Sequence, residues 1–193
     1  MKNICLYCGS SMGARAQYRA AAAEFGLFLA QQGIGLVYGG GHVGLMGVAA
    51  DACLGAGGRV IGVIPETLLR WEVAHKGLSE LHVVASMHAR KAMMADLSDA
   101  FVALPGGFGT FDELFEILTW AQLGIHRKPI ALWNVVGYFD RLLAALDVSV
   151  TEGFVRAPQR NNLISARTWH ALWPQIISYR AAQADVVVDP RAR

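Results

Sequence analysis

Short apolar runs alternate with longer amphipathic stretches along most of the chain, and this alternation constrains the fold more than any other feature. The runs are apolar at nearly every position, which is typical of parallel strands that are covered on both faces. We predict strands at Ile4–Tyr7, Gly35–Tyr38, Val60–Ile64, Leu81–Val84, Ala100–Leu104 and Pro129–Trp133.

Helical patterns fill the intervals between these strands. The stretch Ala14–Gln32 carries Tyr18, Phe25 and Leu29 at helical spacing and precedes Gly33, a residue typical of the end of a helix. Similar patterns predict helices at Gly44–Leu54, Met87–Leu97, Thr110–Leu123 (which Gly124 would end), Gly137–Thr151 and Thr168–Arg180.

Alternating strands and helices of this kind predict an α/β fold: a doubly wound, Rossmann-like and mostly parallel sheet with right-handed crossovers. We expect residues 1–180 to form a single domain and residues 181–193 to form a loose C-terminal tail. In such sheets, ligands bind beyond the carboxyl ends of the strands, where the strand order reverses.

Composition and charge exclude several classes of protein. The chain has 17 Lys and Arg against 15 Asp and Glu, a net charge of +2, which is too small for a general nucleic-acid binder. Its apolar runs fall far short of the ~20 residues that span a bilayer, and its first residues do not resemble a signal peptide. Three cysteines, an odd number, do not suit a secreted disulfide scaffold. We therefore expect a cytoplasmic protein without nucleic-acid or membrane partners.

The first glycine loop, Gly39–Gly47, directly follows a predicted strand and leads into a predicted helix. Backbone N–H groups at such a helix start can hold a phosphate; alternatively, the glycines only permit a tight turn. The spacing Gly39-x-Gly41-x-x-Gly44, with Glu66 after the next strand, also matches the dinucleotide fingerprint. That fingerprint, however, normally occupies the first strand–helix turn.

The second glycine loop, Pro105–Gly109, also follows a strand and would form another anion site, with Thr110 as the N-cap of the next helix. The spacing of Thr110 and Glu113 equally fits a capping box, in which Glu113 has only a structural role. Yet Asp112, Glu113 and Glu116 crowd beside this loop, and carboxylates that face a phosphate site suggest catalysis.

Other polar residues give weaker signals. Arg90 and Lys91 follow a strand and could meet an anionic ligand, although such a pair also fits a solvated helix face. Cys5 and Cys8 have redox spacing, but Cys5 falls inside a predicted strand, so we interpret both as structural. The six histidines show no His-x-x-x-His pair, and we predict no metal site.

Together these motifs resemble the Lonely Guy (LOG) family of cytokinin-activating phosphoribohydrolases over about residues 3–165. The resemblance rests mainly on the arginine–lysine pair upstream of a Pro-Gly-Gly-x-Gly-Thr-x-x-Glu segment, which is more specific than either glycine loop. The matching segments are Cys8–Ser11, Val37–Gly41, Gly44–Gly47, Gly62–Pro65, Met87–His88, Arg90–Lys91, Pro105–Glu113 and Thr119–His126.

The resemblance implies a hydrolase that cleaves the N-glycosidic bond of N6-substituted adenosine 5′-monophosphates, and of AMP if accepted, into free base and ribose 5-phosphate. It implies Arg90 and Glu113 as the catalytic pair, a homodimer with its active site near the subunit interface, and no cofactor. The substrate-binding positions that it implies are Glu72, Lys91, Gly107, Phe108, Gly109, Thr110, Phe111, Asp112 and Thr119. Candidates for phosphate or nucleotide contact in the loops are Gly9, Ser10, Gly40, Gly41 and Met87.

Two other functions stay open on the sequence. A non-catalytic nucleotide-binding module would use the glycine loops and keep Glu113 as a helix cap. An NAD-dependent oxidoreductase would use the dinucleotide fingerprint and Glu66. Family members were once labelled lysine decarboxylases, which would require a lysine that binds pyridoxal phosphate, and the sequence marks none.

Overall fold

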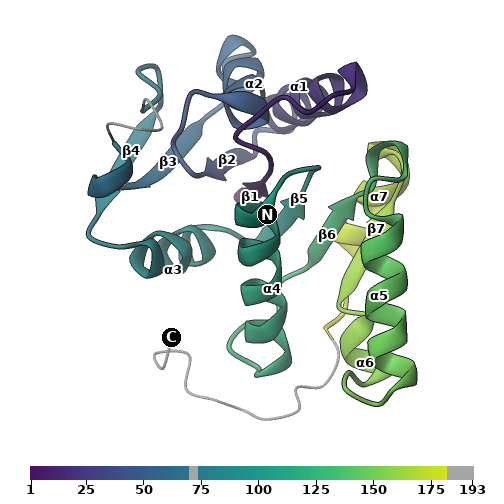
Figure 1. The fold of residues 1–193 in the computed structure, drawn as a ribbon. Coiled ribbons are helices and arrows are strands. Elements are labelled where there is room, and N and C mark those ends of the chain that lie inside the picture. The colour runs from purple at the N-terminus through teal and green to yellow at the C-terminus, as the bar shows by residue number, and fades with distance from the viewer. Residues whose placement is uncertain (70–73, 182–193) are drawn as a thin grey trace.

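The computed structural model describes residues 1–69 and 74–181 and confirms the α/β fold (Figure 1). One seven-stranded parallel sheet has the order β4-β3-β2-β1-β5-β6-β7. Its strands are β1 (Asn3–Tyr7), β2 (Gly35–Tyr38), β3 (Val60–Pro65), β4 (Glu80–Val84), β5 (Ala100–Ala103), β6 (Ile130–Trp133) and β7 (Leu163–Ala166). All six predicted strands are present, with ends that differ by one residue at most. The sequence did not predict β7, which is short and contains Ser165.

The predicted helices are also present; α2 and α3 start where predicted, and the other four start one to three residues away. They are α1 (Ala16–Gln31), α2 (Gly44–Gly55), α3 (Met87–Leu97), α4 (Phe108–Gln122), α5 (Asp140–Thr151) and α7 (Trp169–Ser178). The short helix α6 (Ala157–Arg160) and the 3₁₀ turns η1 (Glu66–Leu68) and η2 (Val135–Gly137) were not predicted. Gly33 and Gly124 follow α1 and α4 with φ of 65° and 76°, as expected for residues that end helices.

Helices cover both faces of the sheet (Figure 1). Helices α1, α2 and α7 pack on one face, and α3, α4 and α5 pack on the other. Side chains of a strand alternate between these two layers, so Leu6 of β1 contacts the first core and Tyr7 the second. We expected every strand to be buried on both faces, and β4 is an exception. It lies at the edge of the sheet, where Leu81 is 39% exposed and Val83 is 47% exposed.

The topology places one crevice at the centre of the sheet. From β1 the chain adds β2, β3 and β4 on one side, then crosses to β5 on the other. The strand order therefore reverses between β1 and β5, and their carboxyl ends lead into Cys8–Ser11 and the second glycine loop. Within the described part of the chain, no helix is long and apolar enough to cross a membrane.

Candidate active site

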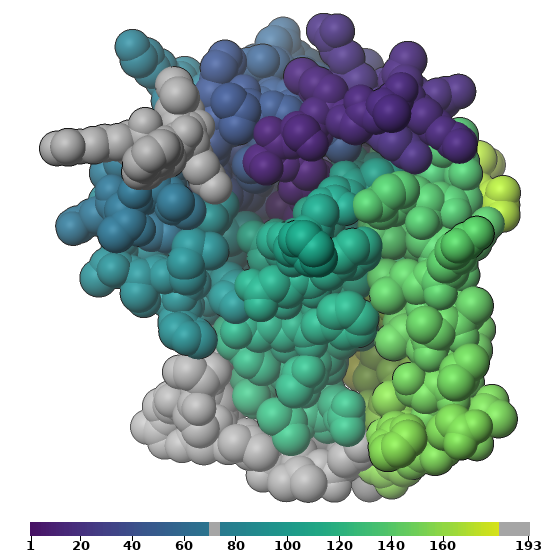
Figure 2. All heavy atoms as spheres, viewed as in Figure 1, coloured from purple at the N-terminus to yellow at the C-terminus, as the bar shows by residue number. Residues whose placement is uncertain are grey.

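A cavity of about 180 Å3 opens at this reversal point. The loop after β1 and the start of α4 lie side by side there (Figure 2), and Gly9 N donates a hydrogen bond to Pro105 O at 3.1 Å. The cavity is lined by Cys8, Ser10, Met46, Leu68, Met87, Arg90, Gly107, Gly109, Thr110, Asp112 and Glu113. The structure thus brings the two predicted catalytic residues, Arg90 and Glu113, into one cavity with Gly107 and Gly109 of the second glycine loop.

Arg90 is held rigidly at the start of α3. Ser86 caps this helix by accepting a hydrogen bond from Ala89 N at 3.1 Å. Arg90 is only 4% exposed, and its Nη2 donates to Gly39 O at 3.1 Å. A Cβ at position 39 would lie 1.8 Å from that Nη2 atom, so any other residue would displace the guanidinium from this position. Gly39 therefore positions Arg90, a role that the sequence did not reveal.

Glu113 is half-buried in α4 and lines the same cavity. Its negative charge acts on the buried end of β1. Burial raises the pKa of the Cys8 thiol well above its ordinary value, and the charge of Glu113 raises it further. Burial first, and then the neighbouring Cys5 and the charge of Glu113, raise the pKa of Tyr7. Cys8 is therefore a protonated thiol in the cavity wall and a poor nucleophile.

The N-terminus of α4 differs from the predicted cap. Gly107, not Thr110, is the N-cap, and no side chain caps the helix. Thr110 lies one turn inside, so the capping box that would give Glu113 a purely structural role does not form. The first N–H groups of α4 stay available for an anion in the cavity. Among the described residues, the buried Thr110 Oγ1 also has no hydrogen-bond partner.

The first glycine loop has a clear role in close backbone packing, whereas its role in ligand binding is less clear. A Cβ at Gly44 would lie 2.2 Å from the backbone of Ser10, and Leu45 N already donates to Gly9 O at 3.0 Å. Gly40 and Gly41 are not among the described residues that line the cavity, so their phosphate role stays a prediction. The dinucleotide match falls on the second strand–helix turn, between β2 and α2.

The positive charge of Lys91 is compensated by two of the three carboxylates beside the second glycine loop. Its Nζ lies 3.1 Å from both Asp112 Oδ2 and Glu116 Oε1. Burial alone would lower the pKa of Lys91, but hydrogen bonds and ion pairs with these two carboxylates raise it above its ordinary value. These pairs tie Asp112 and Glu116 to Lys91, although Asp112 lines the cavity together with Glu113. Direct contact of Lys91 with an anionic ligand stays a prediction.

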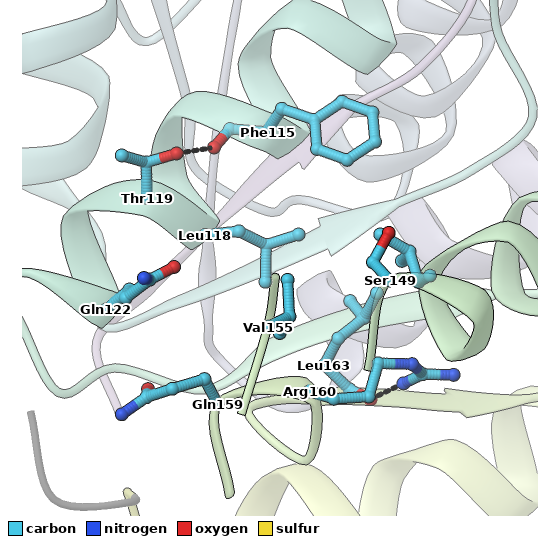
Figure 3. A pocket seen from close by; sticks show the side chains of 10 residues that line it. Phe115, Leu118, Thr119, Gln122, Ser149, Val155, Gln159, Arg160 and Leu163 are labelled. Carbon is cyan, nitrogen blue, oxygen red and sulfur yellow. Dashed lines mark hydrogen bonds between the residues drawn. The ribbon is translucent and has the colours of Figure 1, made fainter. Parts of the chain in front are cut away.

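The remaining predicted binding residues have different surroundings. Phe108 is 94% exposed at the start of α4, whereas Phe111 packs edge-on against Phe139. Thr119 lies outside the cavity, in a groove of about 280 Å3 between α4 and α5 (Figure 3), where its Oγ1 donates to Phe115 O at 2.8 Å. Glu72 lies outside the described residues.

A second, adjacent cavity of about 200 Å3 shows a residue that the sequence analysis missed. Tyr138 lines this cavity with Gly9 and Gly106, and its hydroxyl donates to Gly106 O at 2.5 Å. The preceding turn is strained, since Val136 has a φ of 46°. Tyr138 therefore anchors the second glycine loop. It lies beyond the end of β6, and the rule for strand ends could have marked it as a candidate site residue.

Comparisons with known proteins show the family of this chain. A family model described as "Possible lysine decarboxylase" matches residues 46–176. The cytokinin riboside 5′-monophosphate phosphoribohydrolase LOG of Oryza sativa subsp. japonica is 49% identical over 178 residues, which cover 92% of this chain and 74% of the relative. Its Arabidopsis thaliana relative LOG1 is also 49% identical, over 92% of this chain and 84% of its own length.

Solved structures support the fold independently. The molybdenum cofactor binding protein of Rippkaea orientalis superposes with a TM-score of 0.69 at 24% identity, over 92% of this chain and 99% of that one. At this identity the likeness concerns the fold alone. The identity with the phosphoribohydrolases, by contrast, extends over most of both chains. The chain therefore belongs to the LOG family of cytokinin riboside 5′-monophosphate phosphoribohydrolases.

Proposed function

We propose that this protein hydrolyses the N-glycosidic bond of N6-substituted adenosine 5′-monophosphates, and of AMP, to release the free base and ribose 5-phosphate. The observation that carries the proposal is the convergence of Arg90, Glu113 and the uncapped N-terminus of α4 in one cavity. The names of relatives that are about half identical over most of the chain support the same reaction.

The start of α4 is suited to the 5′-phosphate. Its first N–H groups, from Phe108 to Thr110, have no partner within the helix, and the helix dipole is positive at this end. A Cβ at Gly107 or Gly109 would meet no atom within 4 Å, so open space lies beside this backbone. Ser10 lines the same cavity and could donate from its hydroxyl. Here the phosphate would be bound mainly by backbone groups.

Glu113 is suited to the reacting carbon of the ribose. Cleavage of the C1′–N9 bond leaves positive charge on the ribose, as in other glycoside hydrolyses. A carboxylate near C1′ stabilises this charge and orients or deprotonates the attacking water. Water adds its oxygen to C1′ and finally loses one proton, while the base departs with the bonding electron pair and takes up one proton. Glu113 lies two turns into α4, beyond the proposed phosphate site.

Arg90 is suited to orient these groups. Its bond to Gly39 O fixes one nitrogen of a planar guanidinium, while Arg90 itself lines the cavity. A guanidinium held in this way can donate to substrate oxygens and orient a carboxylate with little further loss of side-chain entropy. We therefore assign Arg90 to substrate positioning and charge stabilisation around Glu113.

The decarboxylase description of the family suits this chain less well. A lysine that forms a Schiff base must lose its proton, and such lysines have a lowered pKa. Lys91 is the lysine next to the cavity, and its pairs with Asp112 and Glu116 raise its pKa instead. Its environment therefore favours a permanently charged structural residue.

The groove between α4 and α5 suggests how Thr119 could take part. Thr119 lies six positions after Glu113 on α4 and therefore points about 120° away from it around the helix. If it contacts substrate, as the family resemblance implies, that substrate belongs to another subunit. We propose that a second copy of the chain covers this groove, where Phe115 is 40% exposed (Figure 3).

Light scattering during size-exclusion chromatography tests the dimer. We expect a dimer for the unmodified chain and a monomer for Phe115→Asp. The control is Leu27→Asp, which changes a residue of similar exposure (43%) on α1. A monomeric unmodified chain, or a dimer that both variants retain, would contradict this interface.

The requirement for a 5′-phosphate tests the proposed reaction. Each charge-assisted hydrogen bond to phosphate is worth about 1.5–3 kcal/mol, so losing two should lower kcat/KM at least about 10²-fold. Much of the loss should fall on kcat, because the bound phosphate helps to hold C1′ against Glu113. We expect this ratio between AMP and adenosine in matched assays. Equal efficiencies would indicate a nucleosidase, and no turnover of either would indicate a binding module.

A further inference from the structure

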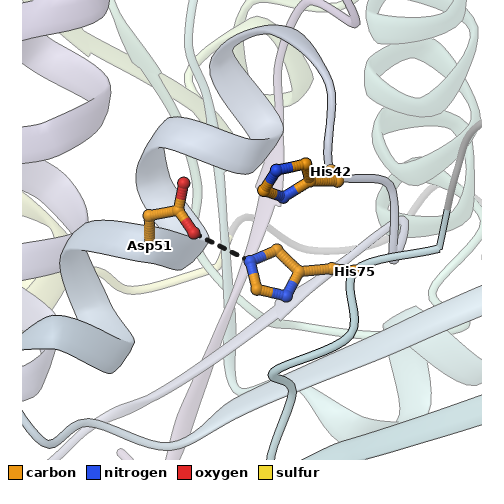
Figure 4. Close-up of side chains that lie close together, drawn as sticks. All are labelled: His42, Asp51 and His75. Carbon is orange, nitrogen blue, oxygen red and sulfur yellow. Dashed lines mark hydrogen bonds and ion pairs between the residues drawn. The ribbon is translucent and has the colours of Figure 1, made fainter.

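Two histidines and an aspartate that are distant in the sequence converge beside the first glycine loop (Figure 4). His42 belongs to the loop between β2 and α2, Asp51 lies in α2, and His75 precedes β4. Backbone bonding fixes the last segment against the loop, since His75 N donates to Gly40 O at 3.0 Å and Gly41 pairs with Ala74. The absence of a His-x-x-x-His pair in the sequence therefore does not exclude a metal site, because the fold brings three possible ligand residues together from three segments.

The side chains come close to the spacing of metal ligands. One ligand atom from each residue lies within 4.8 Å of the other two. His75 Nε2 is 2.9 Å from Asp51 Oδ1, and the rings of His42 and His75 meet edge to face with centroids 4.8 Å apart. Around a metal with bonds of about 2.0–2.2 Å, ligand atoms lie about 3–3.5 Å apart, so small side-chain rotations suffice.

We propose that His42, Asp51 and His75 bind a divalent transition metal ion, with Zn²⁺ the best match. Two imidazole nitrogens and one carboxylate oxygen are a ligand set that zinc accepts with water in the fourth position. His75 is 8% exposed and so supplies a fixed ligand, whereas His42 and Asp51 are exposed and can adjust their rotamers. This site is separate from the cavity that holds Arg90 and Glu113.

Binding at His75 requires one proton to move within its ring. Gly77 N donates to His75 Nδ1 at 3.0 Å, so the proton of the neutral ring is on Nε2, facing Asp51. When the metal occupies Nε2, this proton moves to Nδ1. The Gly77 N–H then donates its hydrogen bond to water instead of to His75. Gly77 is an exposed turn residue, which makes that change small. The number of protons on His75 stays the same.

The metal would join the first glycine loop to α2 and to the segment before β4. The same loop presents Gly39 O to Arg90, three residues before His42. Because the metal binds the folded arrangement and not the unfolded chain, it should stabilise the protein by an amount that grows with the logarithm of the free metal concentration above Kd. The effect concerns stability first and does not depend on the proposed hydrolysis.

A zinc titration of protein that has been freed of affinity tags and treated with a chelator tests the site. With a chromophoric chelator as competitor, we expect one Zn²⁺ per chain and a thermal midpoint that rises with Zn²⁺. His42→Ala and Asp51→Asn should each weaken binding about tenfold or more and remove most of the thermal shift. Both residues are exposed, so these variants should fold even if His75→Ala does not.

A matched control separates this site from general histidine binding. His170→Ala removes an exposed histidine on α7 and should leave both the affinity and the thermal shift unchanged. Bound Co²⁺ should show the visible absorption expected for a four-coordinate site. This absorption should be lost in His42→Ala. Unchanged zinc affinity in His42→Ala and Asp51→Asn, or no specific binding to the unmodified chain, would overturn the proposal.

Discussion

Replacing Glu113 with glutamine tests its catalytic role without a large change in shape. Glutamine keeps the size of the side chain and removes the negative charge that faces the cavity. A preorganised electrostatic group of this kind is worth about 3–4 kcal/mol, so turnover should fall about 10²–10³-fold. The free energy of unfolding should change by about 1 kcal/mol or less, because Gly107 is the N-cap of α4 and Lys91 keeps both of its ion pairs.

Turnover and melting temperature should be measured on the same preparation. For a chain of 193 residues, about 1 kcal/mol corresponds to a shift of about 2–4 °C. Glu116→Gln is a matched control on the same helix: it loses an ion pair with Lys91 but should keep most of its turnover. Near-normal turnover in Glu113→Gln, together with a lowered melting temperature, would refute the catalytic role and favour a structural one.

Substitutions at three further positions test how the site is assembled. Arg90→Ala should be nearly as damaging as Glu113→Gln, and Arg90→Lys should not restore kcat, since an ammonium lacks the planar geometry; recovery in the lysine variant would mean that only charge matters. Gly39→Ala should lower kcat because its Cβ would overlap the guanidinium, yet it should add little in an Arg90→Ala background, and fully additive losses would contradict this coupling. Tyr138→Phe should lower kcat several-fold by freeing Gly106 O, and an unchanged kcat with altered stability alone would make Tyr138 structural.

Local signals in the sequence were sufficient for most of the fold. Helix α3 matches its predicted ends, Met87 and Leu97, because its cap and apolar spacing are local. The start of α4 was wrong because Thr110 is a common N-cap type, whereas an uncapped glycine start has no side-chain signal. Strand β7 was missed because its few residues give no clear pattern.

The site was only partly predictable, because much of it depends on contacts between distant segments. The pairing of Arg90 and Glu113 in one cavity followed from the rule for strand ends and from the family resemblance. The close contact of Gly39 with Arg90 joins residues 51 positions apart, and no pattern in the sequence indicates it. The convergence of His42 with His75 is non-local in the same way.

The most direct test of the central claim is the identification of products. Purified protein should be incubated with isopentenyladenosine 5′-monophosphate and with AMP, and the mixtures analysed by chromatography for free base and for ribose 5-phosphate. We expect equal amounts of base and ribose 5-phosphate, and about 10²–10³-fold slower release from Glu113→Gln. Unchanged nucleotide bound to the protein, or release of inorganic phosphate and nucleoside instead of base, would contradict the claim that this chain is a phosphoribohydrolase.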